Sequence, residues 1–138
     1  MTGPWRNRSG AAAGDGAAAR ALTGRAGEAL AQRHLEARGL RILARNYRVA
    51  RGRSRRGGEI DLVALEPDGT LVFVEVRVRR GGVGGGAAAS VSPAKQSRLV
   101  YAAQTWLTTL ARVPPCRFDV VAVDGERIQW LKAAFDEC

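Results

Sequence analysis

Acidic side chains interrupt the most hydrophobic stretch of the sequence, GGEIDLVALEPDGTLVFVEVR, which runs from Gly57 to Arg77. Glu59, Asp61 and Glu75 lie among Ile, Leu, Val and Phe, where carboxylates are rare unless they are paired. The stretch is typical of two strands joined by a Pro-Asp-Gly turn. If these strands pair, Asp61 and Glu75 converge. Two converging carboxylates and a backbone carbonyl suit a hard cation such as Mg²⁺, which can activate water and bind a phosphate oxygen.

Two cations accompany these acids. Arg77 lies two residues after Glu75, so both side chains project from the same face of a strand. An exposed structural ion pair is the alternative explanation of this pattern, because such pairs are common on strand surfaces. Lys95 lies in the first turn of an expected helix. It is either a phosphate contact assisted by the helix N-terminus or an ordinary surface lysine.

The elements that would position these residues follow one another in the order α-β-β-β-α-β-β. A helix is expected over 25–38, with Glu28 on the inward flank of its apolar stripe. A second helix is expected to begin at Ser92 as N-cap and Pro93, and to continue through Leu110 until two prolines end it. Strands are expected over 40–49, in the two halves of the acidic stretch, and in CRFDVVAV and RIQWLKAAF, which an Asp-Gly turn joins. This order predicts an α/β domain with a mixed central sheet flanked by helices.

The domain organisation is simple. The chain has 138 residues, enough for one domain with a hydrophobic core. Residues 1–22 are Ala/Gly-rich and low in complexity, which is typical of a disordered tail. We therefore predict a disordered tail over 1–22 and a single domain over 23–138.

Positive charge is concentrated in the first part of the chain. The net charge is +9, and residues 1–56 hold 13 Arg against three acidic residues. This imbalance indicates a polyanionic partner, and nucleic acid is favoured over a membrane surface. Contacts to phosphate would give affinity without sequence specificity. The candidate contacts fall within twelve residues that hold no acid: Arg45, Arg48, Arg51, Arg53, Arg55 and Arg56.

Several other functions lack the residues they need. His34 is the only histidine, which leaves a zinc site short of ligands. Cys116 and Cys138 form no CxxC pair, so reduced thiols and a cytoplasmic location are expected. No apolar run approaches the roughly 20 residues that a membrane span requires, and no membrane partner is predicted.

The segments GEIDLVA, VFVEVRVR, SPAKQSRL and RFDVV, in this order, resemble the YraN-like family of bacterial proteins. That family is related to the restriction-endonuclease-like nucleases and, among them, to archaeal Holliday junction resolvases. The resemblance covers about Gly24 to Phe135. It implies a restriction-endonuclease-like fold and a metal-dependent endonuclease. DNA is favoured over RNA as the nucleic acid, branched DNA is a candidate substrate, and a homodimer is a candidate assembly.

The resemblance also implies a set of site residues. Asp61 and Glu75 would hold Mg²⁺ (or Mn²⁺), and the Val76 carbonyl would complete the metal shell. The position of the family's usual lysine is occupied by Arg77. The catalytic set that the resemblance implies is Glu28, Asp61, Glu75, Arg77 and Lys95.

The arginine at position 77 leaves a second function open. Arginine stays protonated and cannot act as a base, although it can hold phosphate or stabilise charge. The alternative is therefore a non-catalytic nucleic-acid-binding protein with a degenerate nuclease site. Asp119, in RFDVV, shares a strand face with Arg117, and we interpret these two residues as a structural ion pair.

Overall fold

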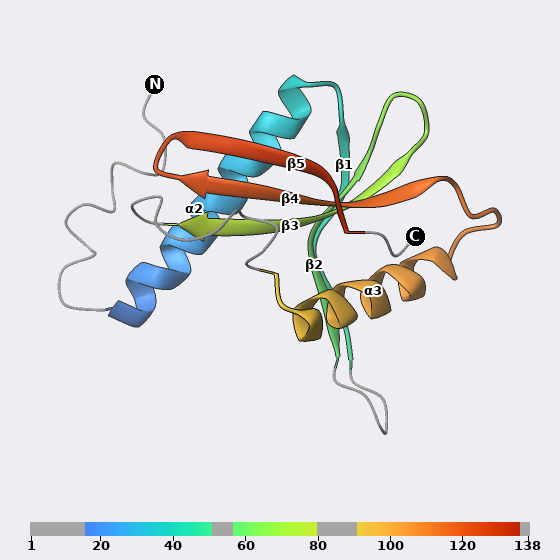
Figure 1. The fold of residues 1–138 in the computed structure, drawn as a ribbon, viewed down its shortest axis with the longest axis horizontal. Helices are drawn as coiled ribbons and strands as arrows, with labels where there is room; N and C mark the ends of the chain where they lie inside the picture. Colours follow the sequence, from blue (N-terminus) through green and yellow to red (C-terminus); the bar gives the residue numbers. More distant parts are fainter. Residues whose placement is uncertain (1–15, 51–56, 80–90, 136–138) are drawn as a thin grey trace.

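A computed structural model of the chain describes residues 16–50, 57–79 and 91–135. It confirms the predicted order and the mixed α/β architecture (Figure 1). The elements are α2 (Gly16–Ala37), β1 (Arg41–Val49), β2 (Gly58–Leu65), β3 (Leu71–Arg79), α3 (Pro93–Leu107), β4 (Cys116–Asp124) and β5 (Arg127–Phe135).

The five strands form one sheet in which the spatial order, β1-β2-β3-β4-β5, is the chain order. The β3–β4 pair is parallel and the other three pairs are antiparallel. A parallel pair needs a long crossover connection, which here contains α3. The turn after β2 is the predicted Pro67-Asp68-Gly69 segment, where Gly69 has a φ of 95° and the Asp68 carboxylate accepts a hydrogen bond from the Thr70 N–H.

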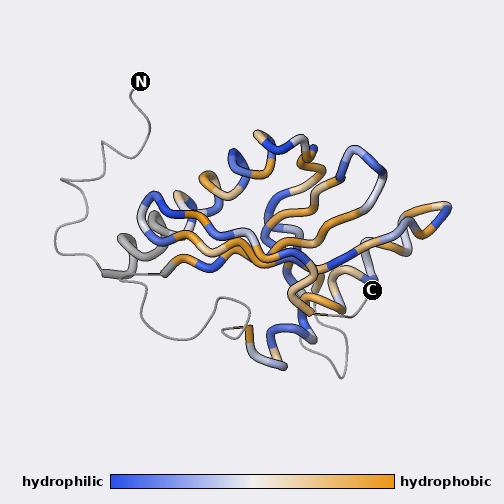
Figure 2. The backbone as a smooth tube through the Cα atoms, turned by 45° about the horizontal axis from the view of Figure 1, so that its top comes forward, coloured by the Kyte–Doolittle hydropathy of each residue, from blue (hydrophilic) through white to orange (hydrophobic). Residues whose placement is uncertain are grey.

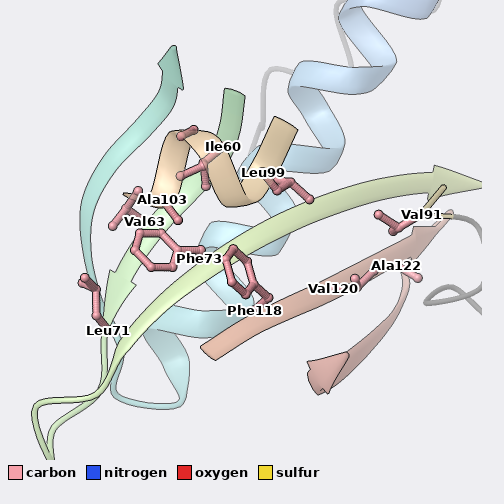
Figure 3. Close-up of a cluster of buried hydrophobic side chains, with 11 residues drawn as sticks. Ile60, Val63, Leu71, Phe73, Val91, Leu99, Ala103, Phe118, Val120 and Ala122 are labelled. Carbon is pink, nitrogen blue, oxygen red and sulfur yellow. The ribbon is translucent and has the colours of Figure 1, made fainter. Parts of the chain in front are cut away.

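The two helices cover opposite faces of the sheet, and the side chains of β3 alternate between them. Leu71 and Phe73 belong to the cluster on the α3 side, drawn in Figure 3, whereas Val72 and Val74 belong to the cluster on the α2 side. Figure 2 shows the resulting hydrophobic colour along the central strands. This arrangement buries β3 on both faces, so a carboxylate on it is held in an apolar setting.

The regular alternation of side chains between the two faces of the sheet is interrupted in β2 and in the neighbouring part of β1. Ile60 and Val63 are three residues apart, yet both pack in the α3-side cluster, and Ala44 and Tyr47 of β1 repeat this spacing against the same cluster. A regular strand would send such pairs to opposite faces. The part of the β1–β2 pair that ends at Val49 and Gly58 is therefore rotated relative to the rest of the sheet, and it packs beside α3.

Gly58, at the start of β2, permits this close packing. A Cβ atom built on it would lie 2.6 Å from the Arg98 carbonyl oxygen and 2.9 Å from the Ala102 Cβ of α3. Because the Arg98 oxygen is a backbone atom of a packed helix, β2 or α3 would have to move to admit a methyl group. Glycine at this position thus keeps β2 in contact with α3.

We expect Gly58→Ala to lower the free energy of unfolding by about 1–3 kcal/mol, the usual cost of overpacking. Thermal unfolding would measure the change. Gly24→Ala is the matched control, since an added Cβ at Gly24 of α2 meets nothing within 4 Å, and alanine there is expected to raise helix stability. Equal melting temperatures for Gly58→Ala and the wild type would contradict the close packing.

Both helices differ from their predicted limits. Helix α2 begins at Gly16 and not at residue 25, because four of residues 16–24 are alanine, the residue with the highest helix propensity. Residues 16–22 of the predicted tail therefore belong to this helix, and residues 1–15 lie outside the described residues. Helix α3 begins as predicted, with Ser92 as N-cap and Pro93 in the first turn.

Helix α3 ends at Leu107, well before the prolines that were predicted to end it. The Thr108 and Thr109 hydroxyls donate to the carbonyls of Thr105 and Trp106 at 2.6 Å, and such bonds compete with helix continuation. Leu110, which was expected to lie within this helix, consequently lies beyond its end and is exposed.

Two further findings concern the cysteine and membrane predictions. Cys116 is disulfide-bonded, so the expectation of a reduced thiol at this position is wrong. Sequence spacing could not reveal this bond, because a disulfide depends on proximity in space.

Neither helix of the described ranges is long and apolar enough to span a membrane.

Candidate active site

The sheet opens where the two predicted carboxylates lie. Pairing between β2 and β3 runs from the turn to Leu62 and Val74 and ends there, whereas β1 stays paired with β2 as far as Gly58. Asp61 and Glu75 are the next residues beyond the last β2–β3 pair, so they face each other at the point where the strands separate. The predicted convergence of these two residues is confirmed, and both line one cleft.

Asp61 is held in a setting that disfavours its charge. Burial, followed by the negative charge of Glu75, raises the pKa of Asp61 to about 8, and the charge of Glu28 adds to the effect. The Val76 N–H opposes the shift by donating to Asp61 Oδ2 at 2.8 Å. A side-chain oxygen thus takes the place that a carbonyl of β2 would occupy in a continued sheet. Burial and the neighbouring negative charges therefore favour the protonated form of Asp61 when no cation is bound beside it.

Glu75 is buried, with 3% of its surface exposed, and lies between two cations. Lys95 Nζ is 3.1 Å from Glu75 Oε2, and the Arg77 Nη1 is 3.4 Å from the same oxygen. The alternative explanation, an exposed Glu75–Arg77 strand pair, is wrong in its exposure, because the Glu75 carboxylate is buried. Lys95 contacts the acid centre, so the interpretation of Lys95 as an ordinary surface lysine is wrong as well.

Glu28 reaches the same region from α2. Burial raises the pKa of Glu28, a hydrogen bond from the Asn46 side chain lowers it, and the charges of Glu59 and Glu75 raise it further. The predicted inward position of Glu28 on the helix is therefore confirmed. Three carboxyl groups from three different elements interact electrostatically: Glu28 of α2, Asp61 of β2 and Glu75 of β3.

Asp61 and Glu75, with Glu59, line a cleft of about 540 Å³ between the β1–β2 ribbon and α3; the cleft has cationic walls, and Glu28 is not among its lining residues. Arg48 lines the β1 wall, where it pairs with Glu59 at 3.4 Å, and Lys95 and Arg98 line the α3 wall. A floor of carboxylates under cationic walls can hold a divalent cation and a polyanion together. The complete lining is Arg48, Val49, Gly57, Gly58, Glu59, Asp61, Glu75, Lys95, Arg98 and Leu99.

The predicted nucleic-acid contacts fall into three groups. Arg48 lines the cleft. Arg45 is exposed on β1 and is not among the residues that line the cleft. The remaining four, Arg51, Arg53, Arg55 and Arg56, lie outside the described residues.

The sequence reasoning missed three residues of this region. Arg98 lies three residues after Lys95, a spacing that puts both on one face of a helix, so this signal was present. Gly58 is needed only because α3 packs against β2, which the sequence alone does not reveal. Asn46 has a φ of 52°, and a single left-handed residue leaves no periodic signal.

The donor set suits a magnesium-like ion. Mg²⁺ is commonly bound by one or two carboxylates, with waters and substrate phosphates as the other ligands, and Asp61 and Glu75 supply two. In the described ranges no three His, Cys, Asp or Glu side chains are grouped to bind a metal by themselves, so other oxygens would have to complete the shell. The role of the Val76 carbonyl stays a prediction.

A second buried carboxylate has a structural role. Asp119 is 1% exposed and accepts hydrogen bonds from Arg117 Nε, Trp130 Nε1 and the Ala133 N–H at 2.9–3.1 Å. Arg117 also donates to Glu66 at 2.6 Å. The predicted structural ion pair of Arg117 and Asp119 is confirmed. The Asp119 carboxylate oxygens accept hydrogen bonds from donors of β4 and β5, so these oxygens are not available to bind a ligand.

The chain is similar to known proteins over this whole region. The sequence model of the family described as "Uncharacterised protein family UPF0102" matches residues 27–123, a span that contains the entire predicted catalytic set. A UPF0102 protein of Cupriavidus taiwanensis is 63% identical over 94 residues, covering 68% of this chain and 67% of the relative. One of Methylibium petroleiphilum is 62% identical over 95 residues, covering 69% and 78%. One of Paracidovorax citrulli is 54% identical over 128 residues, covering 90% and 93%.

Proposed function

This chain belongs to the uncharacterised protein family UPF0102, the family predicted above under the name YraN-like, and on that premise we propose that it is a metal-dependent endonuclease that hydrolyses phosphodiester bonds in DNA. The observation that carries the proposal is the meeting of Asp61 and Glu75 in a cationic cleft. A carboxylate pair in an apolar setting is costly to maintain. The raised pKa of Asp61 is typical of a group kept for function rather than for stability.

The side chains divide the work of the proposed reaction. Asp61 and Glu75 would hold Mg²⁺, which supplies Lewis-acid stabilisation of phosphate charge and activation of water when it is bound. Glu28 would orient the attacking water from the α2 side. Lys95 and Arg77, which pair with Glu75, would supply the positive charge that stabilises the phosphate. Arg48 and Arg98 would bind the flanking phosphates without reading bases.

The proposal is tested with labelled duplex, single-stranded, flap and four-way-junction DNA, each incubated with Mg²⁺ or Mn²⁺. We expect cleavage that EDTA stops, and we expect Glu75→Gln to slow it by at least about 100-fold, the scale on which loss of one preorganised catalytic charge acts. Glu126→Gln is the matched control, because Glu126 is exposed in the β4–β5 turn far along the chain from the site. Metal-dependent cleavage that is equal in the Glu75→Gln variant and the wild type would refute the proposed site.

A second candidate function rests on Arg77, whose guanidinium lies beside Glu75 where a lysine is usual in the resembling nucleases. Because arginine cannot lose its proton, the chain would then bind nucleic acid without cutting it. Binding that survives Glu75→Gln but weakens in the Arg48→Gln/Arg98→Gln variant, with no cleavage of any substrate, would favour this binder. Cleavage gained by Arg77→Lys would show that the native arginine limits the chemistry.

A further inference from the structure

Two cations contact the same oxygen of Glu75, but only one of them belongs to the surface of the cleft. Lys95 Nζ is 3.1 Å from Glu75 Oε2, and Arg77 Nη1 is 3.4 Å from it. Lys95 lines the cleft together with Asp61 and Glu75, whereas Arg77 is not among the lining residues. A phosphate that enters the cleft would therefore meet the lysine ammonium directly.

The first turn of α3 fixes the backbone of Lys95. The Lys95 N–H donates to the Oγ of the N-cap Ser92 at 3.2 Å. The side chain of Gln96 donates to the carbonyl of the buried Val91 at 3.0 Å. These bonds attach the start of the helix to the segment that precedes it, so the lysine side chain extends towards Glu75 from a defined position.

The Lys95 side chain is anchored at its end and is also accessible. Its relative exposure is 35%, against 4% for the side chain of Glu75. An ammonium group has three donors and no acceptor. The contact with Glu75 engages one of these donors, so the others are available to an oxygen of a substrate in the cleft.

The two cations beside Glu75 differ in the chemistry they can perform. Arginine keeps its proton, so Arg77 contributes charge and hydrogen bonds only, whereas a lysine can give up a proton. Cleavage of a phosphodiester leaves a negative charge on the departing oxygen, which a positioned acid can protonate. The chain has 22 Lys and Arg residues, and lysine occurs only at positions 95 and 132. One of these two lysines therefore lies at the single place where an exchangeable proton would serve the reaction.

We propose that Lys95 is the proton donor of the site, and that it supplies from α3 the proton that Arg77 of β3 cannot supply. This role rests on the proposed function, and the family match assigns no proton transfer to either residue. On this assignment the arginine at position 77 does not mark a degenerate site.

The proton balance of the proposed step is simple. The oxygen of the attacking water bonds to phosphorus, and the proton it loses passes to the solvent. The bond between phosphorus and the departing bridging oxygen breaks. The Lys95 ammonium gives its proton to that oxygen and later takes a proton from the solvent.

Lys95→Arg keeps the positive charge at position 95 but removes the exchangeable proton. We expect kcat for DNA cleavage to fall by about 10²- to 10⁴-fold, the range that general acid catalysis contributes. The Kd for DNA should stay within about threefold, because phosphate binding depends on charge. Arg77→Lys should raise kcat by less than about threefold, since Lys95 already supplies the proton. Lys132→Arg is the matched control, because it replaces the other lysine, which is exposed on β5.

A DNA substrate with sulfur in place of the departing oxygen, at the bond that the wild type cuts, separates proton transfer from a folding defect. A thiolate departs without a proton, because a thiol ionises far more readily than an alcohol. The ratio of the wild-type rate to the Lys95→Arg rate should therefore fall to within about fivefold on the sulfur substrate. A misfolded variant would be equally impaired on both substrates.

Two results would overturn the role of Lys95 alone: equal cleavage of ordinary DNA by Lys95→Arg and the wild type, or a rate ratio of the same size on both substrates. Absence of cleavage by the wild type would overturn the endonuclease proposal and, with it, the proton transfer. The two failures are thus distinguished by the activity of the wild type.

Discussion

Replacing Asp61 by asparagine is expected to make the protein more stable at neutral pH and to abolish the proposed cleavage of DNA. Asparagine has the same shape and can still accept the hydrogen bond from the Val76 N–H. It cannot ionise, however, and it is a poor ligand for a hard cation. One substitution should therefore remove both the chemistry and the electrostatic strain of the site.

The direction of this change in stability follows from the pKa of Asp61 in the unfolded chain and in the folded protein. The pKa of Asp61 is raised from 3.8 to about 8 in the folded protein, mainly by burial and secondly by Glu75. Between these values the unfolded chain has lost the proton and the folded protein keeps it. The stability that Asp61 contributes is therefore complete below pH 3.8 and is lost as the pH rises towards 8. At pH 7.5 we expect Asp61→Asn to raise the free energy of unfolding by about 2–4 kcal/mol.

Urea unfolding at pH 5 and pH 7.5, without divalent cations, would measure this difference. The stability of the wild type should fall over this interval, and that of Asp61→Asn should change less. Asp68→Asn is the control, because Asp68 is an exposed turn residue whose pKa is lowered by the Thr70 N–H. A wild type and an Asp61→Asn variant with parallel pH profiles would show that Asp61 is ionised in the folded protein.

Asp119→Asn should have the opposite effect, a loss of about 3–5 kcal/mol, because it breaks a buried ion pair and leaves buried donors of the same network without an acceptor. Arg117 would lose Asp119 and keep Glu66 as an ion-pair partner. The new amide group would also point a donor at Trp130 Nε1 or at the Ala133 N–H, which are donors themselves. The link between β4 and β5 would weaken at the bulge between Phe118 and Val120.

Thermal unfolding would show this as a fall in melting temperature of roughly 10–20 °C. Asp124→Asn, at the less buried end of the same strand, serves as the control and should change little. The activity per folded molecule of Asp119→Asn should stay close to that of the wild type below its melting temperature. A selective loss of cleavage without loss of stability would assign Asp119 to the site.

Much of this architecture was accessible from local sequence patterns. The alternation of β3 placed Glu75 and Phe73 on one face and the valines on the other, and the Ser92-Pro93 pair located the start of α3. The Pro-Asp-Gly turn fixed the pairing of β2 with β3, and with it the meeting of Asp61 and Glu75. Each of these signals lies within a few residues of the feature it predicts.

The features that the sequence did not reveal depend on contacts between distant segments. The threonines after Leu107 end α3 by bonding back to its carbonyls, a choice that a helical apolar pattern does not show. The need for glycine at position 58 follows only from the packing of α3, because a Cβ atom at Gly58 would lie 2.6 Å from a backbone oxygen of that helix. The left-handed backbone of Asn46 also escaped, because the local strand pattern of β1 continues on both sides of it.

The identity of spatial and chain order in the sheet has a consequence for the folding of the chain. Asp61 and Glu75 belong to adjacent strands joined by a short turn, so closing this one hairpin brings them together at a small loop-closure entropy. The parallel β3–β4 pair requires a longer loop to close, and contacts between segments so far apart in the chain form more slowly. The carboxylate pair would accordingly meet early on the folding pathway, and Glu28 and Lys95 would join it only when their helices dock.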